Sequence, residues 1–121
     1  MDERFWKGIR QFNERDFFLA HETLEDLWHE YRETDRVFLQ ALIQLAAGLY
    51  HLDAENWKGA RSQITKGLEK LDRFQPSHQR IDVRTLSAGL QSCLVAADRI
   101  QQGLMQSFDV SLFPQIMILP E

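Results

Sequence analysis

The chain has 121 residues, of which 44% are hydrophobic and 26% are charged, and its formal net charge is −4. These values are ordinary for a soluble globular protein and exclude an intrinsically disordered chain, so we expect a single domain over residues 1–121. The acidic balance, with Lys and Arg scattered along the sequence, argues against a protein that binds nucleic acid.

The sequence shows no segment that would carry the chain to or through a membrane. The first residues, MDERFWKGIRQ, are charged and lack the apolar stretch of a signal peptide. The most apolar run, residues 38–52, contains Gln40, Gln44 and His51 and is too short to span a bilayer. Cys93 is the only cysteine, which excludes an intrachain disulfide and a cysteine metal cluster. We therefore expect a cytoplasmic protein with no membrane partner.

Hydrophobic residues recur at helical spacing through most of the chain, and no run alternates as a half-buried strand does. The spacing predicts helices over residues 2–12, 16–31, 36–52 and 57–72, and a fifth helix from residue 82 to about residue 103. The predicted N-caps are Asp16, Thr34 or Asp35, Asn56 and Asp82. We expect an all-α fold, a compact antiparallel bundle of about five helices.

The last residues, 107–121, are apolar but contain Pro114 and Pro120, which do not suit a helix interior. A segment this apolar is not expected to remain free in water. We predict an extended C-terminal tail that lies over the bundle or over a partner subunit.

The third predicted helix is apolar around most of its circumference, which is typical of a central helix. Gln40, Gln44 and His51 nevertheless fall within one arc roughly 40° wide when the residues are placed about 100° apart. Burying an amide or an imidazole without a hydrogen-bond partner costs roughly 1–3 kcal/mol. This polar stripe therefore predicts either polar groups on a neighbouring helix or a wet cleft.

The second predicted helix offers polar groups that could meet this stripe. His21 and Glu25 flank its apolar face beside Trp28. Helices joined by a short loop pack antiparallel, so His21 and Glu25 are expected to approach the part of the third helix that carries Gln44 and His51.

Several runs in these helices resemble a known bacterial family. They are FFLAHETLEDLW at residues 17–28, RVFLQALIQLAAGLYH at residues 36–51 and Asn56-Trp57-Lys58-Gly59-Ala60. Together they resemble the family called "domain of unknown function 309" over about residues 5–72, and leave the C-terminal helix and tail, about residues 82–121, outside the distinctive motifs. The resemblance implies an all-helical bundle and supplies no catalytic residues. The turn at residues 13–16 lacks the glycine that the family often has there.

One interpretation of the cluster is a catalytic metal site. His21-Glu22-x-x-Glu25 is similar to the His-Glu-x-x-His zinc motif, in which two ligands share a helical face and the Glu between them is a base. Here His21, Glu25 and His51 would hold a divalent metal and Glu22 would act as the general base. The protein would then be a metal-dependent hydrolase.

Two other interpretations need no metal. In the first, His21 or His51 bonds to Glu25 and Gln40 and Gln44 complete a structural hydrogen-bond network. In the second, Trp28 and Tyr50 line a cleft that binds a small-molecule ligand, with the polar cluster at its base.

Taken together, these patterns favour a non-enzymatic binding or interaction module over the metal-dependent hydrolase. We expect it to form a homodimer through its apolar tail or through an exposed face of the hairpin formed by the third and fourth helices.

Overall fold

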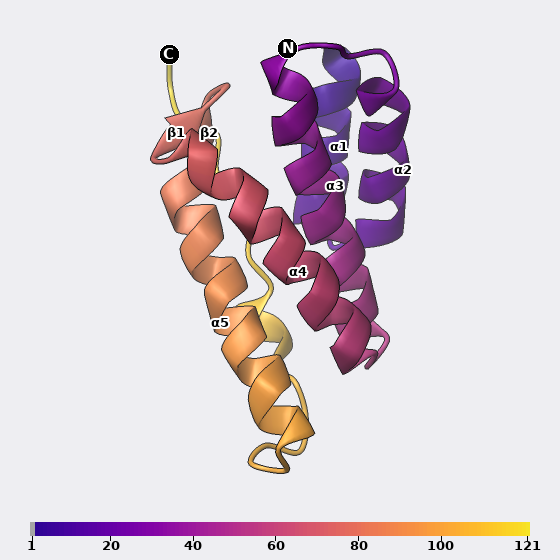
Figure 1. The fold of residues 1–121 in the computed structure, drawn as a ribbon, viewed down its shortest axis with the longest axis vertical. Coiled ribbons are helices and arrows are strands. Elements are labelled where there is room, and N and C mark those ends of the chain that lie inside the picture. Colours follow the sequence, from indigo (N-terminus) through magenta and orange to yellow (C-terminus); the bar gives the residue numbers. More distant parts are fainter. Residues whose placement is uncertain (1) are drawn as a thin grey trace.

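Five α-helices account for most of residues 2–121, the residues that the computed structural model describes (Figure 1). They are α1 (Glu3–Asn13), α2 (Phe17–Trp28), α3 (Thr34–Asp53), α4 (Trp57–Leu71) and α5 (Val83–Gln101). The short turns η1 (Asp72–Phe74) and η2 (Val110–Leu112) and the strands β1 (Ser77–His78) and β2 (Ile81–Asp82) complete the elements. The predicted all-α bundle is confirmed. The two-residue strands of the hairpin are too short to show alternation in the sequence.

Two of the predicted N-cap residues form the expected hydrogen bond. The Asn56 side chain accepts a hydrogen bond from the Gly59 N–H at 3.0 Å, and Asp82 accepts one from the Thr85 N–H at 3.0 Å. Asp16 occupies the N-cap position of α2 without a side-chain bond. The predicted cap of α3 is wrong, because the helix begins earlier and its N-cap residue is Glu33.

The second helix is shorter than predicted and ends at Trp28 rather than at residue 31. The guanidinium of Arg36 donates hydrogen bonds to the carbonyl oxygens of Trp28, at 2.9 Å, and Tyr31, at 2.8 Å. Carbonyl oxygens at a helix C-terminus lack hydrogen-bond partners within the helix. Here the Arg36 guanidinium acts as such a partner for the carbonyl of Trp28. The apolar spacing of Tyr31 fits a helix, but the chain leaves the helix after Trp28.

The α1–α2 and α3–α4 connections have the same kind of backbone turn. In each, a single residue adopts a positive φ, 65° at Arg15 and 61° at Glu55. Glycine suits such a left-handed position best, because it has no Cβ. Arg15 and Glu55 therefore occupy positions at which a glycine would be less strained.

The helix α3 lies in the middle of a layer, with α2 on one side and α4 on the other, while α1 packs on α2 and α5 on α4 (Figure 1). Its side toward the core carries Phe38, Leu42 and Leu49, all fully buried. Its opposite side faces outward and carries Gln40, Gln44, Ala47 and His51, which are partly exposed. The helix is thus central within its layer, and its polar stripe lies on the outer surface of that layer.

The tail lies extended along the bundle, as predicted (Figure 1). The Asn13 side chain accepts a hydrogen bond from the Ile116 N–H at 2.6 Å and donates one to the Ile116 carbonyl at 3.0 Å. Ile118 forms an isolated bridge with Ile81, and Phe113 and Ile116 are buried. Among residues 2–121, no helix combines the length and the apolar character that crossing a membrane requires.

Candidate functional site

The outer surface between α2 and α3 contains two hollows. The first, which we call the histidine hollow, measures about 170 Å³ and is lined by Phe18, His21, Ala47, Tyr50 and His51. The second, the tryptophan hollow, measures about 180 Å³ and is lined by Glu25, Trp28, Gln40, Ile43 and Gln44. We refer to the two together as the α2–α3 groove. All six residues of the predicted polar cluster line it.

An ion pair connects the two hollows. His21 Nε2 in the histidine hollow lies 3.2 Å from Glu25 Oε2 in the tryptophan hollow. The two residues are one helical turn apart on α2, so their side chains lie on the same face. A bond between His21 and Glu25 is one of the contacts that the hydrogen-bond-network interpretation expected.

The histidine hollow has an aromatic rim. The rings of Phe18 and Tyr50 lie 5.7 Å apart, and the two residues are 50% and 46% exposed. Large aromatic residues are usually more buried in a protein of this size. Behind them, His51 Nδ1 lies 3.3 Å from the amide nitrogen of Asn56, at the start of α4.

Trp28 lines the tryptophan hollow, and its indole N–H is buried beneath that surface. The indole Nε1 of Trp28 is shielded from solvent and has no hydrogen-bond partner among the described residues. The Arg36 guanidinium lies over the Trp28 ring, 3.8 Å from its centroid, and holds it in place. Gln44 Oε1 accepts a hydrogen bond from Lys70 Nζ of α4 at 3.0 Å. The N–H groups of the same Gln44 amide take no part in this bond.

The structure brings together only part of the predicted metal site. His21 contacts Glu25, and His51 lines the same hollow as His21, but the hydrogen bond of His51 goes to Asn56. Glu22 is exposed and lines neither hollow. Within residues 2–121, no group of three or more His, Cys, Asp or Glu side chains is placed to hold a metal ion. The metal site therefore stays a prediction that rests on the His21–Glu25 pair.

The premise of a buried polar network is wrong for this cluster. No polar or charged side chain is buried among the residues whose burial the structure describes. The stripe on α3 faces outward because the core side chains of this helix, such as Phe38 against Phe5 of α1, lie on its opposite side. Water reaches these polar groups, so they need no complete set of partners within the chain.

Sequence reasoning missed Phe18, Ile43 and Ala47 as groove residues. Phe18 precedes His21 by three residues and therefore shares its helical face, which is a signal that the sequence contains. Ala47 lies between Gln44 and His51 on the same stripe. Ile43 is apolar and reaches the groove only through the packing of α3 against α2.

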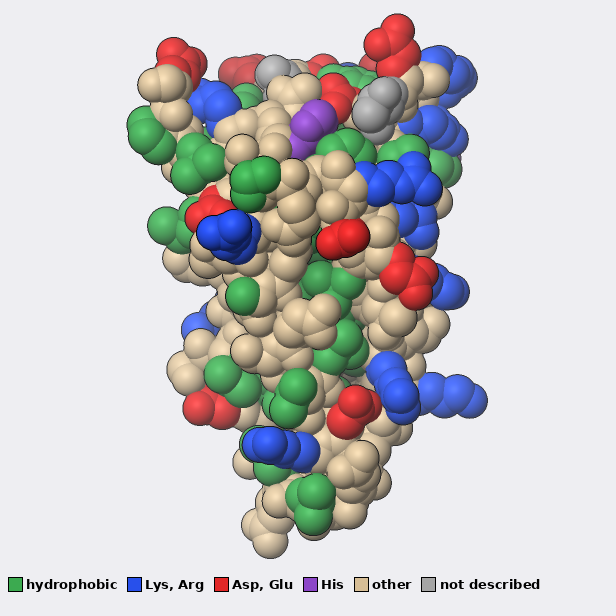
Figure 2. Space-filling model, turned by 60° about the vertical axis from the view of Figure 1, so that its left-hand side comes forward, with side chains coloured by type: hydrophobic (Ala, Val, Ile, Leu, Met, Phe, Trp, Pro, Cys, Tyr) green, Lys and Arg blue, Asp and Glu red, His purple; other side chains and the backbone are tan. Residues whose placement is uncertain are grey.

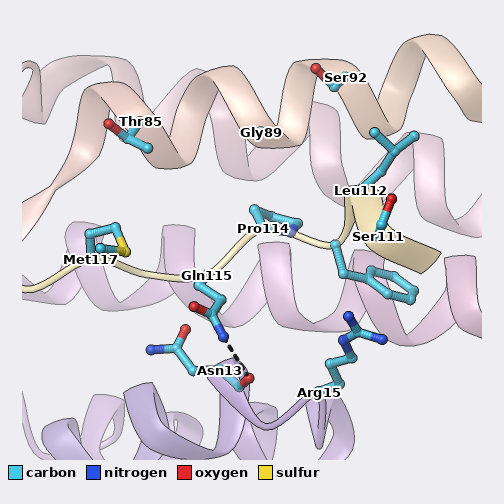
Figure 3. Close-up of a pocket in the computed structure, with 11 residues that line it drawn as sticks. Asn13, Arg15, Thr85, Gly89, Ser92, Ser111, Leu112, Pro114, Gln115 and Met117 are labelled. Carbon is cyan, nitrogen blue, oxygen red and sulfur yellow. Dashed lines mark hydrogen bonds between the residues drawn. The ribbon is translucent and has the colours of Figure 1, made fainter. Parts of the chain in front are cut away.

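A larger hollow, of about 540 Å³, lies between α5, the tail and the α1–α2 turn (Figure 3). Several of its polar side chains have hydrogen-bond partners within the chain. Asn13 binds the backbone of Ile116, Ser111 Oγ donates to Asp109, and Thr85 Oγ1 donates to Asp82. We interpret these contacts as the means by which the tail is held, and assign the hollow no ligand.

The remaining candidates are structural. Cys93 is buried, and burial raises the pKa of its thiol to about 12, which excludes a reactive thiolate near neutral pH. Figure 2 shows the molecule from the side on which α5 lies. On this face, hydrophobic side chains are scattered among charged ones rather than gathered in one patch. The α2–α3 groove is thus the best-supported site.

Residues 5–63 match the model of a family described as Domain of unknown function (DUF309). The match spans α1, α2, α3 and about half of α4, and so includes every residue of the α2–α3 groove. A comparison with curated proteins finds no significant match. Residues 5–63 therefore resemble the DUF309 family, as the motifs of the sequence predicted.

Proposed function

We propose that the protein is a non-enzymatic binding module whose α2–α3 groove holds its ligand. The observation that carries this proposal is the combination of two hollows and an exposed aromatic rim on one surface. Binding sites are typically concave and apolar, with a few polar groups that orient the ligand.

Two physical terms favour a ligand at this place. Covering the exposed surfaces of Phe18 and Tyr50 removes apolar area from water, which stabilises a complex by roughly 25 cal/mol per Å² before the cost of association. The amide N–H groups of Gln44, which lines the tryptophan hollow, could also donate a hydrogen bond to an acceptor on the ligand. The ligand would therefore combine an apolar part with a hydrogen-bond acceptor.

Benzamide combines an aromatic ring with an amide acceptor and is a suitable small probe. We expect it to bind with a dissociation constant on the order of 1 mM, because a ligand of this size gains little more than association costs. Ala47→Trp should abolish this binding, since Ala47 lies on the floor of the groove and the indole would fill it. Chemical-shift mapping by NMR measures both the affinity and the residues affected.

The matched control is Ala88→Trp, which adds the same side chain at an exposed position on α5. This variant should bind benzamide as the unchanged protein does. Both variants should retain the helical circular dichroism spectrum. Shift changes that avoid the groove, or that persist in Ala47→Trp, would contradict the proposal.

The metal-dependent hydrolase is the second candidate, and the 3.2 Å contact between His21 and Glu25 is the observation that favours it. It makes a distinct prediction about metal content. We expect protein purified without an affinity tag to contain Zn, Mn or Fe far below one equivalent, because a third ligand is not in place. Elemental analysis gives the answer. One equivalent of metal that is lost in His21→Ala would favour the metal-dependent hydrolase instead.

A further inference from the structure

We propose that the ligand of the α2–α3 groove is an amphipathic helix of a partner protein, with apolar residues seven positions apart and a basic flank along α2. This inference rests on the proposed function and names the occupant of the same site. Three features of the groove support it: the separation of its hollows, the shape of its floor and the charges on its two rims.

The separation of the hollows matches the repeat of a docked helix. His21 lines the histidine hollow and Trp28 lines the tryptophan hollow, seven residues farther along the same helix. At 1.5 Å per residue, the hollows are therefore about 10 Å apart. Residues i and i+7 of a second helix lie on one face at that same separation. Each hollow, at about 170 and 180 Å³, has room for one leucine- or phenylalanine-sized side chain.

The floor of the groove permits close approach of a second helix. Gln40, Gln44, Ala47 and His51 follow one another along α3 at helical spacing, so the floor runs parallel to the groove. Ala47 is the smallest of them and lines the histidine hollow next to the tryptophan hollow. The amides and the imidazole can exchange hydrogen bonds with polar side chains that flank the apolar residues of the incoming helix. Helices bind in grooves of this kind through apolar anchors and a polar margin.

The two rims carry opposite charges. On α2, Glu25 lines the groove and Glu22 is exposed one turn earlier. On α4, Lys70 binds Gln44, and Lys66, four residues earlier, shares its helical face. His21 pairs with Glu25, and the Arg36 charge is held over Trp28, so neither adds a free cation to the α2 rim. A docked helix is therefore best matched with basic residues toward α2 and acidic or neutral residues toward α4.

A second copy of this chain is a poorer occupant of the groove. The same surface on a second copy would present its own hollows, and the amides, alanine and imidazole of its floor are too small or too polar to fill them. Phe18 and Tyr50 are large enough, but they already form the wall of the histidine hollow. Complementarity therefore requires an apolar ridge, which an amphipathic helix provides.

Defined peptides test this inference. A fluorescent alanine-based peptide of about 18 residues, long enough to be partly helical, carries two leucines seven positions apart and lysines along one flank. A second peptide carries glutamates in place of the lysines, and a third has the leucines on opposite faces. By fluorescence anisotropy, the protein should bind the lysine peptide about tenfold more tightly than the glutamate peptide, and the third peptide should not bind. A difference of tenfold corresponds to about 1.4 kcal/mol.

Charge reversal on the α2 rim gives the decisive comparison. The double variant Glu22→Lys with Glu25→Lys should prefer the glutamate peptide. The control variant Glu14→Lys with Glu69→Lys has the same net charge but places the new lysines away from the groove, so it should keep the original preference. Equal reversal in both variants, or peptide binding that survives Ala47→Trp, would overturn the inference.

The remaining outcomes separate this inference from the proposed function. If benzamide binds in the groove and none of the peptides does, the helix is not the ligand and the binding module stands. If neither benzamide nor peptide binds, both proposals fail. If sedimentation gives twice the monomer mass, and Ala47→Trp restores the monomer, a second copy occupies the groove and the inference is overturned.

Discussion

Replacing Phe38 by alanine is expected to lower the free energy of unfolding by about 3–5 kcal/mol, the largest effect of any single substitution that we predict. Phe38 is fully buried, and its ring lies 6.3 Å from that of Phe5, 5.1 Å from that of Phe74 and 4.7 Å from that of His78. The Phe38 side chain therefore joins α3 to α1, to η1 and to the β1–β2 hairpin. Truncation removes the transfer free energy of the ring and leaves a cavity that these four elements cannot close without moving together.

Denaturant unfolding followed by circular dichroism measures this loss. Phe18→Ala is the matched control, because it removes the same ring from a half-exposed position in the groove. We expect it to change the free energy of unfolding by less than about 1 kcal/mol and to weaken benzamide binding. A destabilisation by Phe18→Ala as large as that by Phe38→Ala would mean that the groove rim is part of the core, which would contradict its assignment as a binding surface.

Gly48→Ala is expected to destabilise the protein by about 1–2 kcal/mol, although alanine is the better helix former. A Cβ at this position would lie 2.5 Å from Ile64 Cγ1 and 3.0 Å from the Ile64 backbone nitrogen. Ile64 is fully buried, so its side chain has no free space to turn into. The repulsion must therefore be relieved by separating α3 from α4, and that separation opens the core. The gain from helix propensity, about 1 kcal/mol, is smaller than the expected cost of overpacking.

A double-mutant cycle with Ile64→Ala isolates this contact. Ile64→Ala alone should destabilise the protein by about 2–5 kcal/mol, but the alanine removes the atom that a Cβ on residue 48 would meet. The double variant should therefore be more stable than the sum of the two single changes allows, by about 1 kcal/mol or more. Strictly additive effects would show that Gly48 does not set the distance between the two helices.

The same helix shows why the sequence predicted which residues of α3 share one side and misjudged how far that side is buried. The positions of Gln40, Gln44 and His51 on one side of α3 follow from the helical period alone. A helical wheel does not show which sides of a helix its neighbours occupy. Because α2 and α4 flank α3 and its core contacts are made on the side of Phe38, Leu42 and Leu49, the polar side remained open to solvent.

His51 illustrates a second limit. The antiparallel arrangement brings it to the same hollow as His21, which the short connection between helices predicts. Its hydrogen bond, however, goes to Asn56, five residues later, because the α3–α4 turn brings the Asn56 amide to the imidazole. Which partner a side chain takes depends on its rotamer and on competing neighbours, and local spacing specifies neither.

By itself, the sequence determined the all-helical class, the caps at Asn56 and Asp82, the extended tail, the resemblance to the DUF309 family and the residues that share the polar side of α3. These features depend on periodicity, on local hydrogen bonding and on motifs, all of which are properties of neighbouring residues. Only the tertiary structure decided the end of α2 at Trp28, the two hollows, the exposed aromatic rim and the opposite charges of α2 and α4 across the groove. Those features arise where helices distant in sequence meet, and packing between them, rather than any local pattern, sets which side chains are covered and which remain open to a ligand.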